Sequence, residues 1–253
     1  MSKIVINKRE TQLINELVAH FELNRHLFLQ FVEQLLPLFT NAKALSPNIH
    51  SMKWRVKEPS HLKDKLIRKI IEAKESKKKF VITKENLFYK INDLAGFRII
   101  HLYTRQIDEI NKALLALFEE ERYRMIERPT ARTWDDESRS YFKEIGIKTQ
   151  ASSSMYTSVH YVIEPNRRTK ITCEIQVRTL MEEVWGEVSH TINYPHKTES
   201  VACNEQLKVL AKVTSSCSRL VDSIFKTDED YRNKSATSKP VYRRRKNKTP
   251  SKA

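Results

Sequence analysis

The apolar positions of this chain follow a helical period at both ends and alternate in the middle. Residues 8–45 place apolar side chains three and four positions apart, which predicts either two helices or one helix bent near Asn24 and ending near Pro37. Residues 49–56 alternate as a half-buried strand does. Pro59 then begins a basic helix over 60–74, since proline is favoured in the first turn of a helix.

The central part of the sequence predicts several short strands separated by helices. Residues 165–168 form a turn between the last two strands, which indicates a hairpin. We expect strands over 96–103, 123–127, 157–164 and 170–178, and helices over 107–120, 180–192 and 201–225. The polar stretch 129–154 is predicted to be an irregular surface insertion with a short helix over 138–145. This order of elements predicts an α+β fold, with a mixed sheet of about five strands flanked by helices.

Charge divides the chain unevenly. Of its 253 residues, 40% are hydrophobic and 30% are charged, and the net charge is +15. Residues 232–253 contain nine Lys or Arg and no acid, which predicts a disordered basic tail that either touches RNA or another polyanion or only aids solubility. We therefore divide the chain into N-terminal helices (1–48), a core (49–200), a C-terminal helix (201–231) and this tail.

Rare residue types exclude several classes of site. Cys173, Cys203 and Cys217 form no Cys-x-x-Cys pair, so we expect reduced thiols and no zinc site. No apolar run is long enough to span a membrane and the N-terminus lacks a signal peptide, so we expect a cytoplasmic protein with no membrane partner. Only three glycines occur, which excludes a Gly-rich phosphate loop. Any bound phosphate must then be held by Lys and Arg side chains.

Two carboxylates in strand-like apolar surroundings are the strongest chemical signal. Asp93 precedes Arg98, and Glu174 precedes Arg178. Two buried carboxylates brought together by folding would suit Mg²⁺, and neighbouring arginines suit phosphate. The alternative for Asp93 is a turn or helix cap.

Basic residues upstream could grip a polyphosphate. Arg55 and Lys57 share one face of a predicted strand, and Lys65 and Arg68 share one face of the next helix. The alternative is an ordinary solvated basic surface.

Two later strands carry polar residues on single faces. Tyr156 and His160 alternate on one strand, while Glu174, Gln176 and Arg178 alternate on the next. An exposed tyrosine can stack on a nucleobase. Simple packing, or solvent-facing decoration, is the alternative.

The joint order of these motifs, over about residues 53–194, resembles the synthetase domain of the RelA/SpoT family. The resemblance implies a nucleotidyltransferase-like fold and transfer of the β,γ-pyrophosphate of ATP to the 3′-hydroxyl of GDP or GTP, giving (p)ppGpp and AMP. The chain resembles a small, synthetase-only member of the family, since it contains no His-Asp dipeptide of the kind found in a hydrolase domain.

The resemblance also implies a role for each matching residue. Asp93 and Glu174 would be catalytic and bind Mg²⁺, with Glu174 also helping to deprotonate the attacking hydroxyl. ATP would be bound by Arg55, Lys57, Lys65, Arg68 and Arg98, with Arg55 and Arg98 sandwiching adenine. The acceptor would be bound by Tyr156 as a stacking platform, and by His160, Gln176, Arg178, Glu183 and His190.

The departures from the family pattern lie on the acceptor side. Met155 replaces the usual glycine before Tyr156, Thr130 replaces a lysine, and Glu183 replaces an asparagine that reads guanine. Two other readings therefore stay open: a toxin-like relative that pyrophosphorylates the tRNA 3′ end or adenine nucleotides, and an inactive nucleotide- or RNA-binding module. The terminal helices could support a homo-oligomer or bind an antitoxin, or merely cover the sheet.

Overall fold

The computed structural model describes residues 6–152, 154–193 and 197–237, which form one mixed sheet with helices on both faces. The six strands of this described part are β1 (Ser51–Val56), β2 (Ala95–His101), β3 (Arg124–Thr133), β4 (Lys148–Ala151), β5 (Ser158–Glu164) and β6 (Cys173–Thr179). The helices are α1 (Lys8–Asn41), α2 (Pro59–Glu75), α3 (Leu87–Lys90), α4 (Gln106–Glu120), α5 (Asp136–Glu144), α6 (Leu180–Asn193) and α7 (Val201–Thr237), with a 3₁₀ turn at Ser46–Asn48. The predicted α+β class is confirmed.

The sheet order is β1-β2-β6-β5-β3-β4. β2 pairs with β6 in parallel and β3 with β4 in parallel, while the other neighbours are antiparallel. The predicted hairpin between β5 and β6 is present. Since β2 and β6 are neighbours, the segments that carry Asp93 and Glu174 meet although they lie far apart in sequence.

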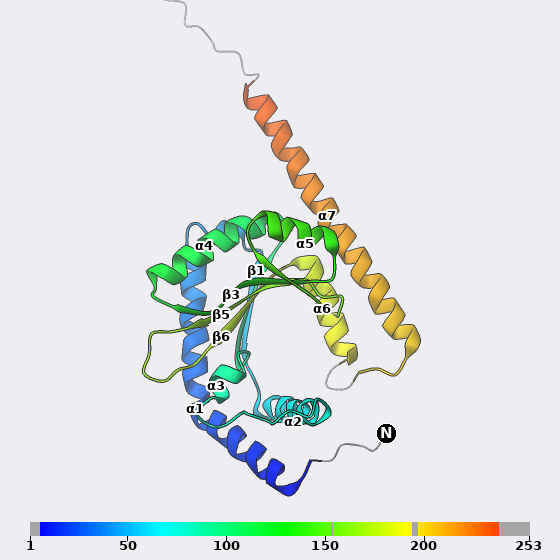
Figure 1. Ribbon diagram of the computed structural model, residues 1–253. Coiled ribbons are helices and arrows are strands. Elements are labelled where there is room, and N and C mark those ends of the chain that lie inside the picture. The colour runs from blue at the N-terminus through cyan, green and yellow to red at the C-terminus, as the bar shows by residue number, and fades with distance from the viewer. Residues whose placement is uncertain (1–5, 153, 194–196, 238–253) are drawn as a thin grey trace, which may run out of the picture.

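The core lies between the sheet and two helices. Figure 1 shows α1 and α4 on one side of the sheet and α6 and α7 on the other. Phe39 of α1 packs edge-on against Phe97 of β2, with ring centroids 5.0 Å apart. Phe118 of α4 completes this aromatic contact. One face of the sheet is therefore closed by apolar packing, and the opposite face remains for polar side chains.

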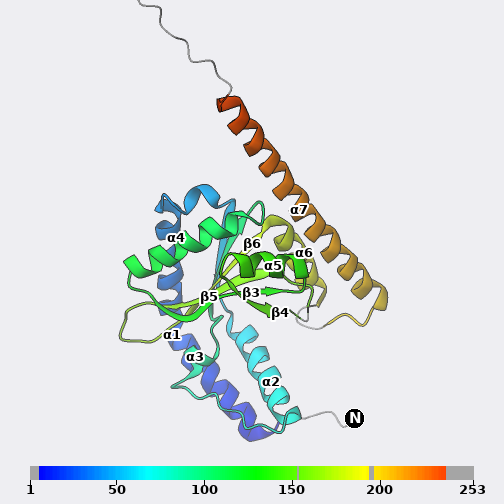
Figure 2. The ribbon, with the colours of Figure 1, turned by 45° about the horizontal axis from the view of Figure 1, so that its top comes forward.

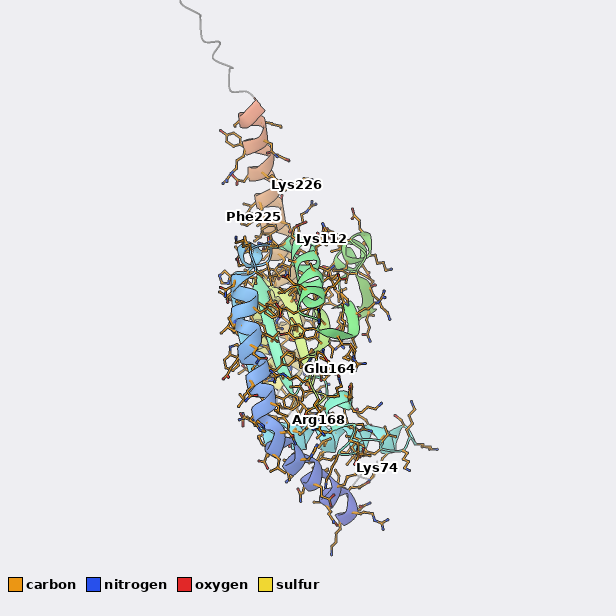
Figure 3. The ribbon with its side chains drawn as sticks, turned by 90° about the vertical axis from the view of Figure 1, so that its left-hand side faces the viewer. Lys74, Lys112, Glu164, Arg168, Phe225 and Lys226 are labelled. Atoms are coloured by element: carbon orange, nitrogen blue, oxygen red, sulfur yellow. The ribbon has the colours of Figure 1, made fainter. Side chains whose placement is uncertain are left out.

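Helix α1 is one continuous helix (Figure 3). It continues past Pro37 to Asn41, so the prediction that the helix would end near this proline was wrong. Its N-terminus is fixed by a capping box between Asn7 and Glu10. Proline removes one backbone hydrogen bond. Leu35 and Phe39 are fully buried on either side of it, and their burial outweighs that loss.

The stretch 129–154 is more regular than predicted. β3 continues to Thr133, α5 forms close to the predicted helix, and β4 adds a sixth strand to the sheet. Pro129 lies where the register of β3 against β5 shifts between Glu127 and Thr130. A strand tolerates proline at such an irregularity, where no ladder hydrogen bond is required.

The C-terminal helix runs further than predicted. α7 extends to Thr237, so the first part of the predicted tail is helical and 238–253 lie outside the described residues. Figure 2 shows its second half projecting away from the body of the protein. Within the described residues, no helix combines the length and apolar character that crossing a membrane requires.

Candidate active site

The register of the sheet builds the site as two rows on its open face. In one row Arg55 of β1 faces Gly96 of β2, which faces Glu174 of β6. In the other row Arg98 lies beside Gln176, which lies beside His160 of β5. Side chains two residues apart on a strand share a face. The predicted polar residues of four separate segments are thereby brought onto one surface.

Asp93 and Glu174 line the same cavity, which has a volume of about 280 Å³. Asp93 sits in the turn before β2 and Glu174 lies on β6. Nothing lies within 4 Å of the position that a Cβ atom of Gly96 would take, so the space above this strand is open. The cavity is also lined by Lys53, Trp54, Arg55, Phe97, Arg98, Gln176, Glu187 and His190. The expected convergence of the two acids is present.

Each carboxylate is neutralised by its own neighbours. The Lys65 Nζ atom lies 2.8 Å from Asp93 Oδ1, and the Lys57 Nζ atom lies 3.1 Å from Asp93 Oδ2. Burial acts to raise the pKa of Asp93, but these two ammonium groups outweigh it and hold the pKa below its usual value. Asp93 is therefore ionised at neutral pH.

Glu174 is ionised for a similar reason. His160 Nδ1 lies 2.9 Å from Glu174 Oε1, and the Gln176 amide donates to Glu174 Oε2 at 2.8 Å. Burial acts to raise the pKa of Glu174, but the contacts with His160 and Gln176 bring it below the usual value. His160 thus contacts a catalytic candidate directly, although the sequence placed it on the acceptor side.

The lysines that were predicted to bind ATP lie on α2 and just after β1. Lys57 and Lys65 both contact Asp93, which lines the cavity. Neither these two lysines nor Arg68 of α2 line the cavity themselves. Lys57 is largely buried, and this burial lowers its pKa. The lysines now pair with a carboxylate, and a bound polyphosphate would offer them further anionic oxygens.

Several residues that were predicted to bind the acceptor form a second network, centred on Glu183 of α6. This buried carboxylate lies 2.9 Å from Lys53 Nζ and 3.3 Å from Arg98 Nη1. It also forms an ion pair with the buried Arg178. Because three cations surround it, Glu183 fixes the positions of arginines that belong to both halves of the site.

Tyr156 lies beside this network. The Arg178 guanidinium sits 5.5 Å from the Tyr156 ring centroid, and the Tyr156 hydroxyl donates to Gln176 Oε1 at 3.2 Å. Trp185 packs nearby at 6.4 Å between centroids. Burial raises the pKa of the Tyr156 phenol. The ring is held in one orientation, as a stacking surface requires.

The two carboxylates could supply only part of the ligand set of a magnesium ion. Among the described residues, no group of three or more His, Cys, Asp or Glu side chains is placed to hold a metal. Mg²⁺ is commonly held by one or two carboxylates together with water and substrate phosphates. Asp93 and Glu174 provide such a pair on the wall of an open cavity.

Several lining residues escaped the sequence reasoning. Lys53, Trp54 and Glu187 line the cavity. Lys53 precedes Arg55 by two positions on β1, so the alternation rule could have found it. Glu187 follows Glu183 by one helical turn, and its contact with Arg98 could not be seen before α6 was placed on the sheet.

Comparisons with known proteins agree with this architecture. A Streptococcus mutans UA159 protein, smu.1046c, superposes with a TM-score of 0.59 at 22% identity, covering 81% of this chain and 95% of that one. The small alarmone synthetase 1 of Bacillus subtilis gives 0.58 at 18% identity, covering 83% and 99%. A GTP pyrophosphokinase family protein of Streptococcus pneumoniae gives 0.53 at 19% identity, covering 93% and 100%. At these identities the likeness establishes the fold.

Sequence comparison gives the family. No curated protein matched the sequence. Residues 54–199, which are more than half of the chain and contain every site residue predicted from the sequence, match the family model described as a region found in RelA / SpoT proteins. The chain therefore belongs to the RelA/SpoT family.

Proposed function

We propose that this protein transfers the β,γ-pyrophosphate of ATP to the 3′-hydroxyl of GDP or GTP, giving (p)ppGpp and AMP. The observation that carries the proposal is the shared cavity of Asp93 and Glu174, flanked by Arg55 and Arg98. Structures of the B. subtilis small alarmone synthetase 1 bound to its product pppGpp and to AMPCPP have the same fold as this chain.

The donor half of the reaction follows from the charges around Asp93. Lys57, Lys65 and Arg68 bind the ATP phosphates, and Arg55 and Arg98 hold adenine by stacking, because a guanidinium plane packs on an aromatic face. A magnesium ion held by Asp93 and Glu174 would neutralise charge on the transferred phosphates. Positioning and electrostatic stabilisation supply most of the catalysis in such transfers.

The acceptor half centres on Glu174. The 3′-oxygen attacks the β-phosphorus of ATP, the bond from that phosphorus to the bridging oxygen breaks, and AMP leaves with that oxygen. Glu174 accepts the proton of the hydroxyl, with His160 and Gln176 fixing its two oxygens. Tyr156 stacks on the acceptor base, and Arg178 and His190 support the acceptor phosphates.

The test is magnesium-dependent release of AMP from ATP and GDP. We expect Asp93→Asn and Glu174→Gln each to lower this rate by about 10²–10³-fold, since each removes a charge from the reacting centre. The matched control is Asp108→Asn, because Asp108 lies on α4 beside Lys112, away from the cavity. Normal rates in either site variant, with an unchanged circular dichroism spectrum, would refute the assignment of these carboxylates.

A second candidate acceptor is the tRNA 3′ end or an adenine nucleotide. Glu183 supports it, because this carboxylate is engaged by Lys53, Arg98 and Arg178 where an amide was expected to read guanine. Mass spectrometry of the products formed from ATP and a mixed pool of GDP, GTP, ATP and tRNA identifies the acceptor. No AMP release with any acceptor would instead favour an inactive binding module.

A further inference from the structure

The open face of the sheet continues beyond the candidate site onto β3 and β4, which lie at one edge (Figure 2). The register places Thr130 of β3 between His160 of β5 and Lys148 of β4. Two positions further along β3, Arg132 lies beside Ser158 of β5. Residues that face each other across paired strands project on the same side of a sheet. Arg132 and Lys148 therefore share a face with the residues proposed to perform the reaction.

Burial along β3 alternates as this placement requires. Ala131 and Thr133 are fully buried, and helices α4 and α5 pack against this strand. Thr130 and Arg132 stay partly exposed, and Lys148 is exposed. Because successive side chains of a strand point to opposite faces, Arg132 projects from the side of β3 that is opposite the two buried residues.

The charge of Arg132 is unused within the described part of the chain. Its Nε atom is buried and has no hydrogen-bond partner, and its guanidinium group forms no ion pair with another described residue. Shielding part of a charged group from water without a partner is costly. Lysine is common on an edge strand such as β4, where it discourages pairing with another sheet. A partly buried arginine without a partner has no such use, so its position indicates an anionic ligand.

The proposed acceptor directs its phosphates toward this part of the sheet. Every residue that lines the cavity of Asp93 and Glu174 comes from β1, β2, β6, α6 or the turn before β2. An acceptor with its 3′-hydroxyl at Glu174 and its base on Tyr156 extends beyond that cavity across β5. In ribose the 3′-hydroxyl and the 5′-carbon project from opposite faces of the ring, so the 5′-phosphates leave the reacting centre. With ATP on the β1 and β2 side, the direction that remains is toward β3 and β4.

The acceptor phosphates also need cations whose charge is not already neutralised. Arg178 is buried and forms an ion pair with Glu183, which reduces what it offers a phosphate. Arg132 and Lys148 have no such partner among the described residues. A guanidinium group binds phosphate through two parallel N–H groups, and an ammonium group binds it as a point charge.

We propose that Arg132 and Lys148 bind the 5′-phosphates of the acceptor nucleotide. The assignment rests on the proposed function, because it names the part of the acceptor that this extension of the open face holds. The shared chemistry is a phosphate on the 5′-oxygen of the nucleoside whose 3′-hydroxyl reacts. GDP and GTP supply it as a diphosphate or triphosphate, and the 3′ end of tRNA supplies it as a phosphodiester.

The first test is calorimetric titration of the full chain with GDP and with guanosine. Magnesium and AMPCPP are present throughout, since the methylene group between the α- and β-phosphates of AMPCPP prevents transfer. Arg132→Gln should raise the Kd for GDP by about tenfold, and Lys148→Ala by about threefold, because each removes a cation from the phosphates. Neither variant should change the Kd for guanosine, which has the same base and ribose without phosphate.

Two matched controls and one rescue separate phosphate binding from structural damage. Arg168→Gln removes a charge from the exposed turn at the other end of β5, and Lys143→Ala removes one from the exposed surface of α5. Neither control should alter either Kd. Arg132→Lys keeps the charge and should recover most of the affinity for GDP. Circular dichroism establishes that each variant is folded, and the KM for ATP should stay unchanged.

A second arm uses a short RNA ending in CCA in place of GDP. A loss of affinity for GDP in Arg132→Gln assigns the two cations to free nucleotides, and a loss confined to the RNA assigns them to a tRNA acceptor. Unchanged affinity for both ligands would overturn the proposal, and so would an equal loss for guanosine and GDP.

Failure of this assignment differs from failure of the proposed reaction. If AMP release with GDP is normal and Arg132→Gln binds GDP as the wild type does, the reaction stands and the phosphate-binding role of Arg132 falls. If no acceptor yields AMP while Arg132→Gln still weakens GDP but not guanosine, the reaction falls and the binding role stands.

Discussion

Gly186 lies in the interior of helix α6, where a residue with a side chain would stabilise the helix more. A Cβ atom there would lie 2.7 Å from Arg178 Nη1, closer than van der Waals contact allows. Arg178 is itself buried and is fixed by Glu183 and by the Tyr156 ring. Glycine in a helix interior costs about 1 kcal/mol relative to alanine. This position therefore sacrifices helix stability so that a guanidinium group can lie against the helix.

Gly186→Ala separates these two effects. We expect the free energy of unfolding to change by no more than about 1 kcal/mol, because the helix gain from alanine is offset by the weaker contact between the displaced Arg178 and Glu183. Displacement of Arg178 should raise the KM for the acceptor several-fold and leave the KM for ATP nearly unchanged. Steady-state kinetics with each substrate varied in turn measures this difference. Val188→Ala, on the exposed side of the same helix, is the control and should change neither KM.

The site shows which residues sequence alone can identify. Gln176 and Arg178 could be found because strand alternation fixes which side chains share a face. The role of Glu183 could not be found this way. Its partners Lys53 and Arg98 come from β1 and β2, and only the packing of α6 onto the sheet brings them together. Long-range ion pairs depend on tertiary placement, which no local pattern encodes.

Asp135 joins two elements at the scale of the helices. Its Oδ1 accepts from the Glu137 backbone N–H at 3.1 Å and caps α5. Its Oδ2 accepts from the Ser215 hydroxyl at 2.7 Å and from Arg219 Nη1 at 2.8 Å, both on α7. Asn7 caps α1 through a similar bond to the Glu10 N–H at 2.9 Å, without a comparable contact to a distant helix. Comparing the two caps therefore separates the effect of capping a helix from the effect of the contacts between Asp135 and α7.

We therefore expect Asp135→Ala to destabilise the protein more than Asn7→Ala. Loss of a cap costs about 1 kcal/mol, and loss of the contacts to α7 should add about 1 kcal/mol. Urea unfolding gives both free energies. Equal losses in the two variants would show that the contacts between α5 and α7 contribute nothing.

The elements whose bounds were predicted best are helices with one apolar and one polar face. Helices α2 and α4 were found within a residue or two of their bounds, since each has one apolar stripe. β4 was missed because its four residues are mostly exposed at the edge of the sheet and carry no alternation. The end of α1 was misplaced because Pro37 is a strong local signal, and burial of the flanking residues overrides it.

Charge acts on the whole molecule. The net charge is +15, and residues 238–253 contribute seven Lys or Arg and no acid to it. A run of this kind attracts any polyanion with little regard to its sequence, and each phosphate that it neutralises releases counterions. In the proposed reaction, GDP and GTP are small ligands that the residues of the folded cavity bind without the basic run. A tRNA acceptor would reach far beyond that cavity and could contact the basic run.

Removing residues 238–253 therefore distinguishes the two acceptors. With GDP, we expect kcat/KM to be unchanged, because every residue that lines the cavity lies within 53–190. Binding of tRNA should weaken, and the slope of log affinity against log salt concentration should become shallower by up to about six units, less the contribution of basic side chains that do not reach phosphate. Fluorescence anisotropy over a salt series measures the slope, and AMP release measures the reaction.

A truncated chain that binds tRNA with the original slope would show that the folded domain, and not the basic run, holds the nucleic acid. If AMP release with tRNA falls in parallel with binding while the GDP reaction persists, the tail delivers a polyanionic acceptor to a cavity whose own residues perform the transfer.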